Sequence, residues 1–187
     1  MRIGLIGSHG TGKSTLVTEL LKKLPQYSTV KEKSRGVLDK GLGLNFKTTQ
    51  KTQLSFIQSY ITMFEFENNS NILTSRTLVD LYAYTYYFAN HREYDVNLFL
   101  LSKINALLLN KLSWWDLFFY IPIEFKQTET NQYREGQREH PEYQIEIDYY
   151  IQKTLNLFKV PFITLKGTVE ERTKKILTEV KKCQKKL

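Results

Sequence analysis

One segment constrains what this chain can fold into more than any other: Gly7-Ser8-His9-Gly10-Thr11-Gly12-Lys13-Ser14. It is a complete G-x-x-x-x-G-K-[ST] phosphate-binding pattern. The apolar run from Ile3 to Ile6 precedes it, and the residues after Lys13 follow the apolar spacing of a helix. Glycines let successive backbone N–H groups turn around a polyphosphate, and the positive end of the helix faces the same anion. We therefore expect a strand–loop–helix unit that binds a nucleoside triphosphate.

The residue types in this loop suggest separate tasks. We expect Lys13 to contact the β- and γ-phosphates and the Ser14 hydroxyl to bind Mg²⁺. The other loop residues up to Thr15 complete the predicted ATP-binding set, with His9 contributing through its backbone alone.

Length and composition narrow the class of protein. A chain of 187 residues is predicted to form a single domain spanning residues 1–187, which suits a small kinase or a GTPase. The N-K-x-D and D-x-x-G signatures of GTPases are absent from the sequence, so a kinase is favoured. We expect no membrane association, because no apolar stretch is long enough to span a bilayer and no signal peptide is recognisable. The lone Cys183 predicts that disulfides play no part and that the protein is cytoplasmic.

The formal net charge of +8 predicts attraction to polyanions. Part of this excess suits nucleotide substrates. Much of the rest lies in the lysine-rich segment 174–186, where a solvated helix face is the simpler explanation. A nucleic-acid surface is compatible with the charge but is not required by it.

Apolar runs and helical patterns alternate along the chain. Strands are predicted at residues 2–6, 28–31, 71–75, 116–121 and 161–165, and helices at 13–24, 48–68, 78–90, 95–112, 142–158 and 170–186. This alternation predicts an α/β fold in which a parallel sheet lies between two helical layers.

Charged residues follow the second and third predicted strands, at the sheet edge where open parallel sheets bind ligands. Glu32 is a candidate to accept a proton from an attacking hydroxyl, and Arg35 to hold the acceptor; an ordinary helix start is the alternative. Arg76 ends an apolar strand, where a lone charge needs an anionic partner such as phosphate. Asp80 is a candidate substrate contact and a reserve base, and also a structural ion-pair partner for Arg76.

Two later segments complete the candidate site. The polar stretch 126–141 carries Arg134 and Arg138 and is predicted to be a lid whose arginines neutralise the transferring phosphoryl group; a solvated loop is the alternative. Gly167 and Thr168 follow the last strand. They are candidates to contact the adenine edge, or to form a simple turn with Thr168 as the helix N-cap.

Taken together, these motifs resemble the small P-loop kinases of the AAA_28 group, which includes ribosylnicotinamide kinase domains and bacteriophage nucleotide kinases related to thymidylate and deoxynucleoside kinases. The resemblance rests on the phosphate loop, the E-x-x-R pattern from Glu32 to Arg35, Arg76 with the following Leu78-Val79-Asp80, the arginines of the predicted lid, and Gly167-Thr168 with Arg172. It implies the P-loop fold with strand order 2-3-1-4-5, and contact between Gln58 and the acceptor base. If a phage encodes the protein, the predicted location is the host cytoplasm.

One position departs from that family's pattern. Relatives commonly carry Asp-Arg at the end of the third strand, whereas this chain has Ser75 before Arg76. A serine cannot act as a base at neutral pH, so the role of base moves to Glu32. Three functions therefore stay open: an ATP- and Mg²⁺-dependent kinase for a nucleoside or nucleoside monophosphate, a kinase for a hydroxymethylated base within DNA, and an ATP-binding regulatory module with weak catalysis.

Overall fold

The computed structural model describes residues 1–30, 41–44, 47–68, 70–91, 93–124 and 141–184. Its centre is a five-stranded sheet whose pairings are all parallel, in the order β2-β3-β1-β4-β5. The predicted α/β class and strand order are therefore confirmed. The strands are β1 (Arg2–Ile6), β2 (Ser28–Thr29), β3 (Ile72–Thr74), β4 (Leu117–Tyr120) and β5 (Ile163–Thr164).

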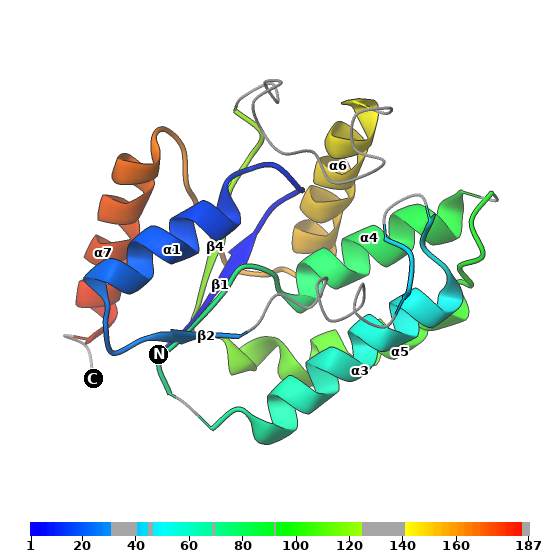
Figure 1. Ribbon diagram of the computed structural model, residues 1–187, viewed down its shortest axis with the longest axis horizontal. Helices are drawn as coiled ribbons and strands as arrows, with labels where there is room; N and C mark the ends of the chain where they lie inside the picture. The colour runs from blue at the N-terminus through cyan, green and yellow to red at the C-terminus, as the bar shows by residue number, and fades with distance from the viewer. Residues whose placement is uncertain (31–40, 45–46, 69, 92, 125–140, 185–187) are drawn as a thin grey trace.

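Helices connect these strands (Figure 1). They are α1 (Lys13–Lys23), α3 (Gln50–Phe66), α4 (Leu78–Asn90), α5 (Phe99–Lys111), the 3-10 turn η2 (Leu112–Trp114), α6 (Pro141–Leu157) and α7 (Val169–Gln184). The helix predicted to start at residue 95 begins only at Phe99. Asp95 instead forms an isolated parallel bridge with Thr49, and this extended pairing is incompatible with a helical turn at that point.

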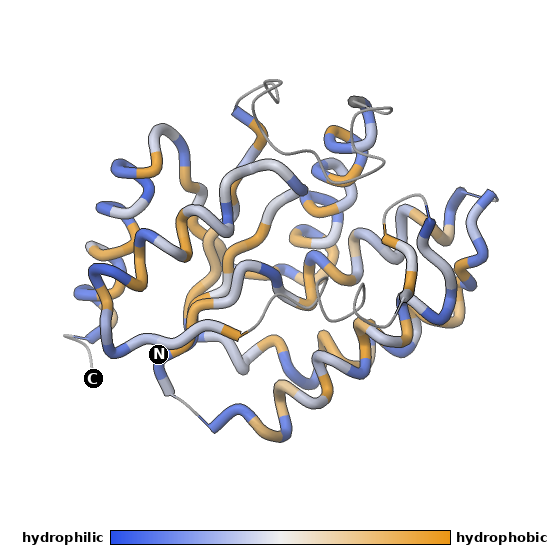
Figure 2. The backbone as a smooth tube through the Cα atoms, viewed as in Figure 1, coloured by the Kyte–Doolittle hydropathy of each residue, from blue (hydrophilic) through white to orange (hydrophobic). Residues whose placement is uncertain are grey.

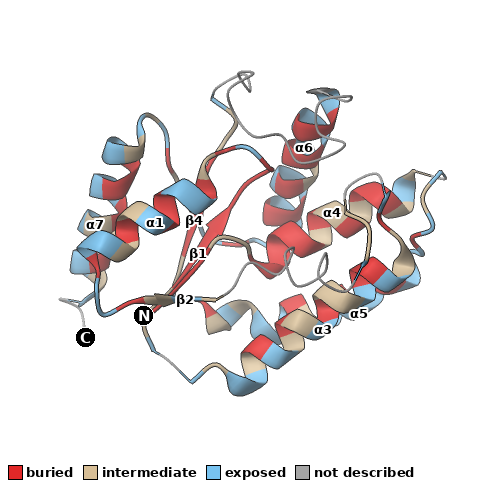
Figure 3. Cartoon of the chain, in the orientation of Figure 1, coloured by how far each residue is buried: buried red, intermediate tan, exposed pale blue. Residues whose placement is uncertain are grey.

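Two helical layers cover the sheet, as Figure 1 shows. Along β4 and just beyond it, Phe118 and Tyr120 pack into the cluster formed with α3, α4, α5 and α6, whereas Phe119 and Ile121 pack into the cluster formed with α1 and α7. This period-two alternation follows from strand geometry. Figure 2 shows the apolar residues of the central strands, and Figure 3 shows these strands buried between the layers. No helix within the described ranges is long and apolar enough to cross a membrane.

The parallel register brings the carboxyl ends of the strands to one edge of the sheet. Ile6, the last residue of β1, lies beside Tyr120, the last residue of β4, and Gly4 of β1 lies beside Thr74, the last residue of β3. The phosphate loop after β1 is therefore flanked by the residues that follow β3 and β4. This arrangement is set by topology, since all strands of a parallel sheet end on the same side.

Candidate active site

The phosphate loop joins β1 to α1 and depends on its glycines. Gly10 and Gly12 have φ angles of 74° and 88°, in the left-handed region that side chains other than glycine rarely adopt. At Gly7, an added Cβ would lie 2.6 Å from the carbonyl oxygen of Ile121. The three glycines of the motif therefore serve backbone conformation and close approach.

Lys13 lies inside the loop. Its side chain is buried, and its Nζ donates to the carbonyl of Ser8 and, at 3.1 Å, to Thr11 Oγ1. Thr11 Oγ1 donates in turn to the same Ser8 carbonyl at 3.0 Å. Ser14 and Thr15 are exposed in the first turn of α1. The lysine is thus held beside the loop backbone, next to an accessible hydroxyl.

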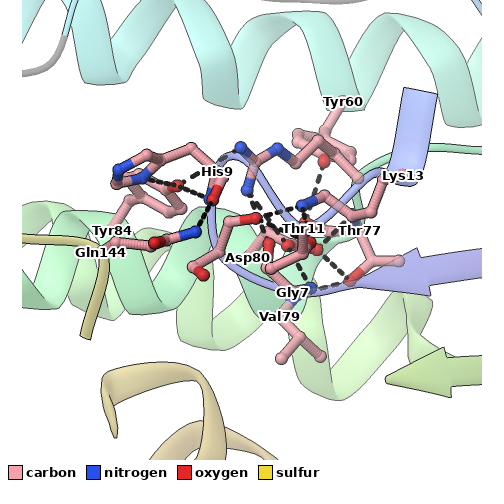
Figure 4. Close-up of polar contacts among 12 residues, drawn as sticks. Gly7, His9, Thr11, Lys13, Tyr60, Thr77, Val79, Asp80, Tyr84 and Gln144 are labelled. Atoms are coloured by element: carbon pink, nitrogen blue, oxygen red, sulfur yellow. Dashed lines mark hydrogen bonds and ion pairs between the residues drawn. The ribbon is translucent and has the colours of Figure 1, made fainter. Parts of the chain in front are cut away.

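Asp80 and Arg76 connect the start of the loop to the residues that follow β3. Figure 4 shows Asp80 beside Gly7. The Gly7 N–H donates to Asp80 Oδ1 at 3.1 Å, and Arg76 Nη1 donates to the Gly7 carbonyl at 3.0 Å. The two side chains also form an ion pair at 3.3 Å, the structural alternative predicted from their spacing. Burial opposes the charge of Arg76, but Tyr84 and Asp80 outweigh it and raise the pKa of Arg76, so the guanidinium stays charged.

Asp80 is positioned by the helix start at which it lies. Thr77 is the N-cap of α4 and accepts from the Val79 N–H, while the Thr77 N–H and hydroxyl both donate to Asp80 Oδ2, at 2.8 and 3.1 Å. The side chain of Asp80 is only 2% exposed and accepts hydrogen bonds from Gly7, Arg76 and Thr77. These contacts commit the carboxylate to holding the loop.

The side chain of His9 links the loop to α4 through Tyr84. The Tyr84 hydroxyl accepts from the His9 N–H at 3.0 Å and from Arg76 Nη2 at 3.3 Å, and it lies 3.1 Å from His9 Nδ1. Burial raises the pKa of Tyr84, so its proton is retained and is available to His9 Nδ1. Burial, together with the charges of Arg76 and Lys13, lowers the pKa of His9 to about 3. His9 is therefore neutral, and the network assigns its proton to Nε2.

Helix α6 approaches the loop from another side. The Tyr143 ring stacks on the His9 imidazole with centroids 4.9 Å apart, and Gln144 Nε2 donates to the His9 carbonyl at 2.6 Å. Figure 4 shows Gln144 and Tyr84 converging on the backbone of His9. Both the N–H and the carbonyl of His9 are thus bonded to side chains outside the loop.

Helix α7 reaches the loop through Arg172. This buried side chain donates from Nη1 to the Thr11 carbonyl at 2.9 Å and from Nη2 to Glu124 Oε2 at 2.7 Å. Glu124 also accepts from the Gly167 N–H at 2.8 Å. Arg172 therefore joins the loop to the residues after β4 and β5.

Thr168 is the residue before α7, and its contacts follow the capping alternative. Its hydroxyl accepts from the Glu171 N–H at 3.2 Å, and its own N–H donates to Glu171 Oε2 at 2.7 Å. This backbone bond lowers the pKa of Glu171. The Thr168 carbonyl accepts from the Arg172 N–H at 3.0 Å, and the Gly167 N–H donates to Glu124, so these groups of the turn are bonded within the protein.

The structure leaves several predicted residues outside its description. Glu32, Arg35, Arg134 and Arg138, with the predicted lid up to residue 140, fall in ranges that the structure does not describe. Ser75 is partly buried directly before Arg76. Gln58 is described and lies on the exposed side of α3, whereas the buried glutamine of this helix is Gln53, which bonds Thr48 and Thr85. The contact predicted between Gln58 and the acceptor base stays a prediction.

Sequence reasoning missed three contacts with the loop: that of the His9 side chain with the Tyr84 hydroxyl, that of Gln144 with the His9 carbonyl and that of Arg172 with the Thr11 carbonyl. Each joins residues more than seventy positions apart in the chain, so no local pattern reports it. Among the described residues, no group of three His, Cys, Asp or Glu side chains forms a metal site.

The family model described as an AAA domain, AAA_28, matches residues 2–172 of this sequence. The chain belongs to the AAA_28 family. The match begins at β1 and ends at Arg172, so it includes every loop contact described above. No curated protein matches this AAA_28 chain in sequence.

Solved structures share the fold of this AAA_28 protein at low sequence identity. Deoxyadenosine kinase from M. mycoides superposes with a TM-score of 0.72 at 18% identity, covering 97% of this chain and 100% of that one. Thymidylate kinase from Candida albicans gives 0.70 at 16% identity, covering 97% and 91%. The NadR protein in complex with NR gives 0.67 at 17% identity, covering 88% of this chain but 45% of NadR. The fold is thus one that nucleoside and nucleotide kinases use.

Proposed function

We propose that this AAA_28 protein is an ATP-dependent phosphotransferase that phosphorylates a nucleoside or a nucleoside monophosphate by direct in-line transfer. The observation that carries the proposal is that the phosphate loop and the charged residues after β3 lie together at one edge of the sheet. A complete phosphate loop is bonded through Gly7 to Arg76 and Asp80, which follow the adjacent strand. A charged arginine next to the loop is suited to hold an anionic acceptor or the transferring group. The kinases that share the fold add support.

The proposed roles follow the chemistry of phosphoryl transfer, in which positioning and charge neutralisation do most of the work. Lys13 exchanges its present contacts with the loop for the β- and γ-phosphates. Arg134 and Arg138 neutralise the transferring group, Arg35 and Arg76 hold the acceptor, and Glu32 orients the attacking hydroxyl. Asp80 keeps the loop in place, since its oxygens are occupied by other donors. The turn at Gly167 and Thr168 is proposed to lie against the adenine, while the Thr168 carbonyl accepts from the Arg172 N–H.

The residues present fit Mg²⁺. This ion commonly takes one or two protein oxygens and fills its remaining positions with phosphate oxygens and water. Ser14 offers an exposed hydroxyl in the first turn of α1, beside the buried Lys13. When bound, Mg²⁺ would neutralise part of the charge on the phosphates.

The charge distribution favours a free nucleotide over DNA as acceptor. Several of the excess lysines lie in the second half of α7, such as Lys181 and Lys182 in its last turn. Arg172 marks the point at which α7 meets the loop. At about 1.5 Å per residue, Lys181 lies roughly 14 Å farther along the helix. These lysines therefore belong to a helix end remote from the phosphate loop.

The decisive experiment supplies γ-labelled ATP and Mg²⁺ with nucleosides, nucleoside monophosphates, ribosylnicotinamide and DNA containing hydroxymethylated bases, and separates the products. We expect label on a free nucleoside or monophosphate, with a shallow dependence of rate on salt. Label on DNA, with a rate that falls steeply as salt is raised, would instead identify DNA as the acceptor. If the protein binds ATP but transfers phosphate to none of these acceptors, the remaining hypothesis is an ATP-binding regulatory module.

Glu32 is the proposed base, and its variant separates catalysis from binding. Glu32→Gln should lower kcat while the Kd for ATP changes little, because the amide keeps the shape but cannot accept the proton. Wild-type turnover in this variant would refute the assignment.

A further inference from the structure

Three alternate carbonyl groups of the phosphate loop each accept a hydrogen bond from a side chain outside the loop. The pairs are Gly7 with Arg76 Nη1 at 3.0 Å, His9 with Gln144 Nε2 at 2.6 Å and Thr11 with Arg172 Nη1 at 2.9 Å. The three donors come from the segment after β3, from α6 and from α7. Three separate parts of the fold therefore hold the same short loop.

Peptide geometry translates these contacts into the direction of the N–H groups. In a planar trans peptide, the carbonyl and the N–H of the next residue point in opposite directions. The N–H of Gly10 therefore points away from Gln144, and the N–H of Gly12 points away from Arg172. The peptide before His9 is reversed: its N–H donates to Tyr84, and its carbonyl, that of Ser8, accepts from Lys13 Nζ.

These contacts hold the Gly10 and Gly12 N–H groups facing away from Gln144 and Arg172, in the same loop whose Ser8 carbonyl accepts from Lys13 Nζ. An anion bound by this loop meets backbone N–H groups and an ammonium together, which is the chemistry that recognises a phosphate chain. Without the outer donors, the glycines would let these peptides rotate at little cost, because glycine adopts either sign of φ.

Both distant donors are themselves rigidly placed. Gln144 is 9% exposed in the first turns of α6, next to Tyr143, which stacks on His9. Arg172 is 3% exposed, and its second nitrogen is bonded to Glu124. A buried donor of fixed direction constrains a peptide more strongly than a mobile surface side chain does.

We propose that Gln144 and Arg172 are positioning residues that set the phosphate-binding conformation of the loop, and so determine affinity for the triphosphate tail and not for the base. This inference rests on the proposed function, since it names how that same site grips its nucleotide. Neither side chain needs to touch the ligand, because each acts through a loop peptide.

The test measures the Kd of the full-length protein for ATP and for inorganic tripolyphosphate, both with Mg²⁺. Gln144→Leu should weaken both ligands by the same factor, about three- to tenfold, the value of one hydrogen bond. Arg172→Lys, which replaces the planar fork by a single ammonium, should act in the same direction. Gln152→Leu on α6 and Lys174→Ala on α7 are matched controls. Gln152 donates to Tyr120 and Asp148 and so loses hydrogen bonds away from the loop, and Lys174 is exposed; each variant should keep the wild-type Kd.

Thermal unfolding of the same variants separates positioning from general stability. Gln144→Leu with a lowered melting temperature but a wild-type Kd for tripolyphosphate would overturn the inference. Loss of ATP affinity alone would also overturn it, because contact with the base or sugar would then explain the effect. A wild-type protein that binds neither ligand would instead refute the proposed function itself.

Discussion

Burial beside two cations makes the His9 imidazole a neutral group over the whole physiological pH range. The pKa of His9 is lowered to about 3, with burial as the largest cause and Arg76 and Lys13 as further ones. A neutral ring can accept the Tyr84 proton at Nδ1 while it stacks on Tyr143. The residue type is thus used for its shape and its acceptor nitrogen, not for its charge.

This lowered pKa predicts a pH dependence of stability. Between pH 6.5 and 3 the unfolded chain protonates its histidine while folded His9 stays neutral, so protons favour unfolding and stability falls as the pH is lowered. The His9 contribution is about 1.4 kcal/mol per pH unit, or about 2 kcal/mol between pH 6.5 and 5. His9→Asn, whose amide oxygen can still accept from Tyr84, should lack this part of the loss.

Urea unfolding at both pH values measures that difference, and other titrating groups cancel between wild type and variant. His91→Asn is the control, because His91 is partly exposed and its Nδ1 lies 2.7 Å from the Tyr87 carbonyl, one turn earlier in the chain. Equal pH dependence in wild type and His9→Asn would mean that folded His9 has an ordinary pKa.

Lys13 allows a second prediction at the residue scale. Lys13→Ala should weaken ATP binding about tenfold or more, because hydrogen bonds to charged groups are worth about 1.5–3 kcal/mol. Lys22→Ala removes an exposed lysine of the same helix, which forms an ion pair with Glu19, and should leave the Kd unchanged. Isothermal titration calorimetry measures both; unaltered affinity in Lys13→Ala would exclude the loop as the nucleotide site.

At the scale of the element, helix α4 begins with a capping box that also supports the site. Thr77 bonds the N–H of Val79, and Asp80 bonds the N–H of Thr77 as well as that of Gly7. The Asp80 carboxylate therefore caps the start of α4 and also binds the backbone of the phosphate loop. Tyr60 of α3 adds a hydrogen bond to the Thr77 carbonyl at 2.8 Å.

Removing this cap has a defined cost. Thr77→Ala should lower the free energy of unfolding by about 1 kcal/mol, within the range of 0.5–2 kcal/mol measured for N-cap threonines. Thr178→Ala is the matched control, since Thr178 is exposed within α7 and its hydroxyl donates to the Lys174 carbonyl one turn earlier. Equal stability of the two variants in urea would show that the cap contributes nothing.

At the scale of the whole molecule, β1 and the start of α4 approach so closely that only glycine fits at position 4. A Cβ added to Gly4 would lie 2.6 Å from Thr77 Cγ2 and 3.1 Å from both Phe118 and Trp115. The contact joins the central strand to the helix that carries Asp80. A displacement of Thr77 at this contact would therefore also displace Asp80, which bonds both Thr77 and Gly7 of the phosphate loop.

Gly4→Ala should destabilise the fold by about 1–3 kcal/mol, the usual cost of overpacking a core. Thr77→Ser keeps the capping hydroxyl but removes the methyl group that would clash. The double variant Gly4→Ala/Thr77→Ser should therefore recover part of the loss, as denaturant unfolding can measure. Additive losses in the double variant would contradict this packing.

The strands, the helices and the phosphate loop follow from local properties of the sequence. Period-two and helical apolar spacing are visible in short windows, and the loop needs its glycines, lysine and serine at fixed separations. These features predicted the parallel sheet between two helical layers, and the family resemblance supplied its strand order; both are confirmed. They also marked Arg76 and Asp80 as a pair, which the structure joins.

The partners of the loop backbone were decided by the tertiary structure. Gln144 meets His9 and Arg172 meets Thr11 across more than 130 residues of chain, and the direction of α6 and α7 over the sheet brings each pair together. Gln58, assigned by resemblance, lies on the exposed side of its helix because Gln53 and Ile57 occupy the buried side. A sequence specifies short-range conformation through each residue's own preferences, whereas a hydrogen bond between distant elements exists only once packing has fixed both ends.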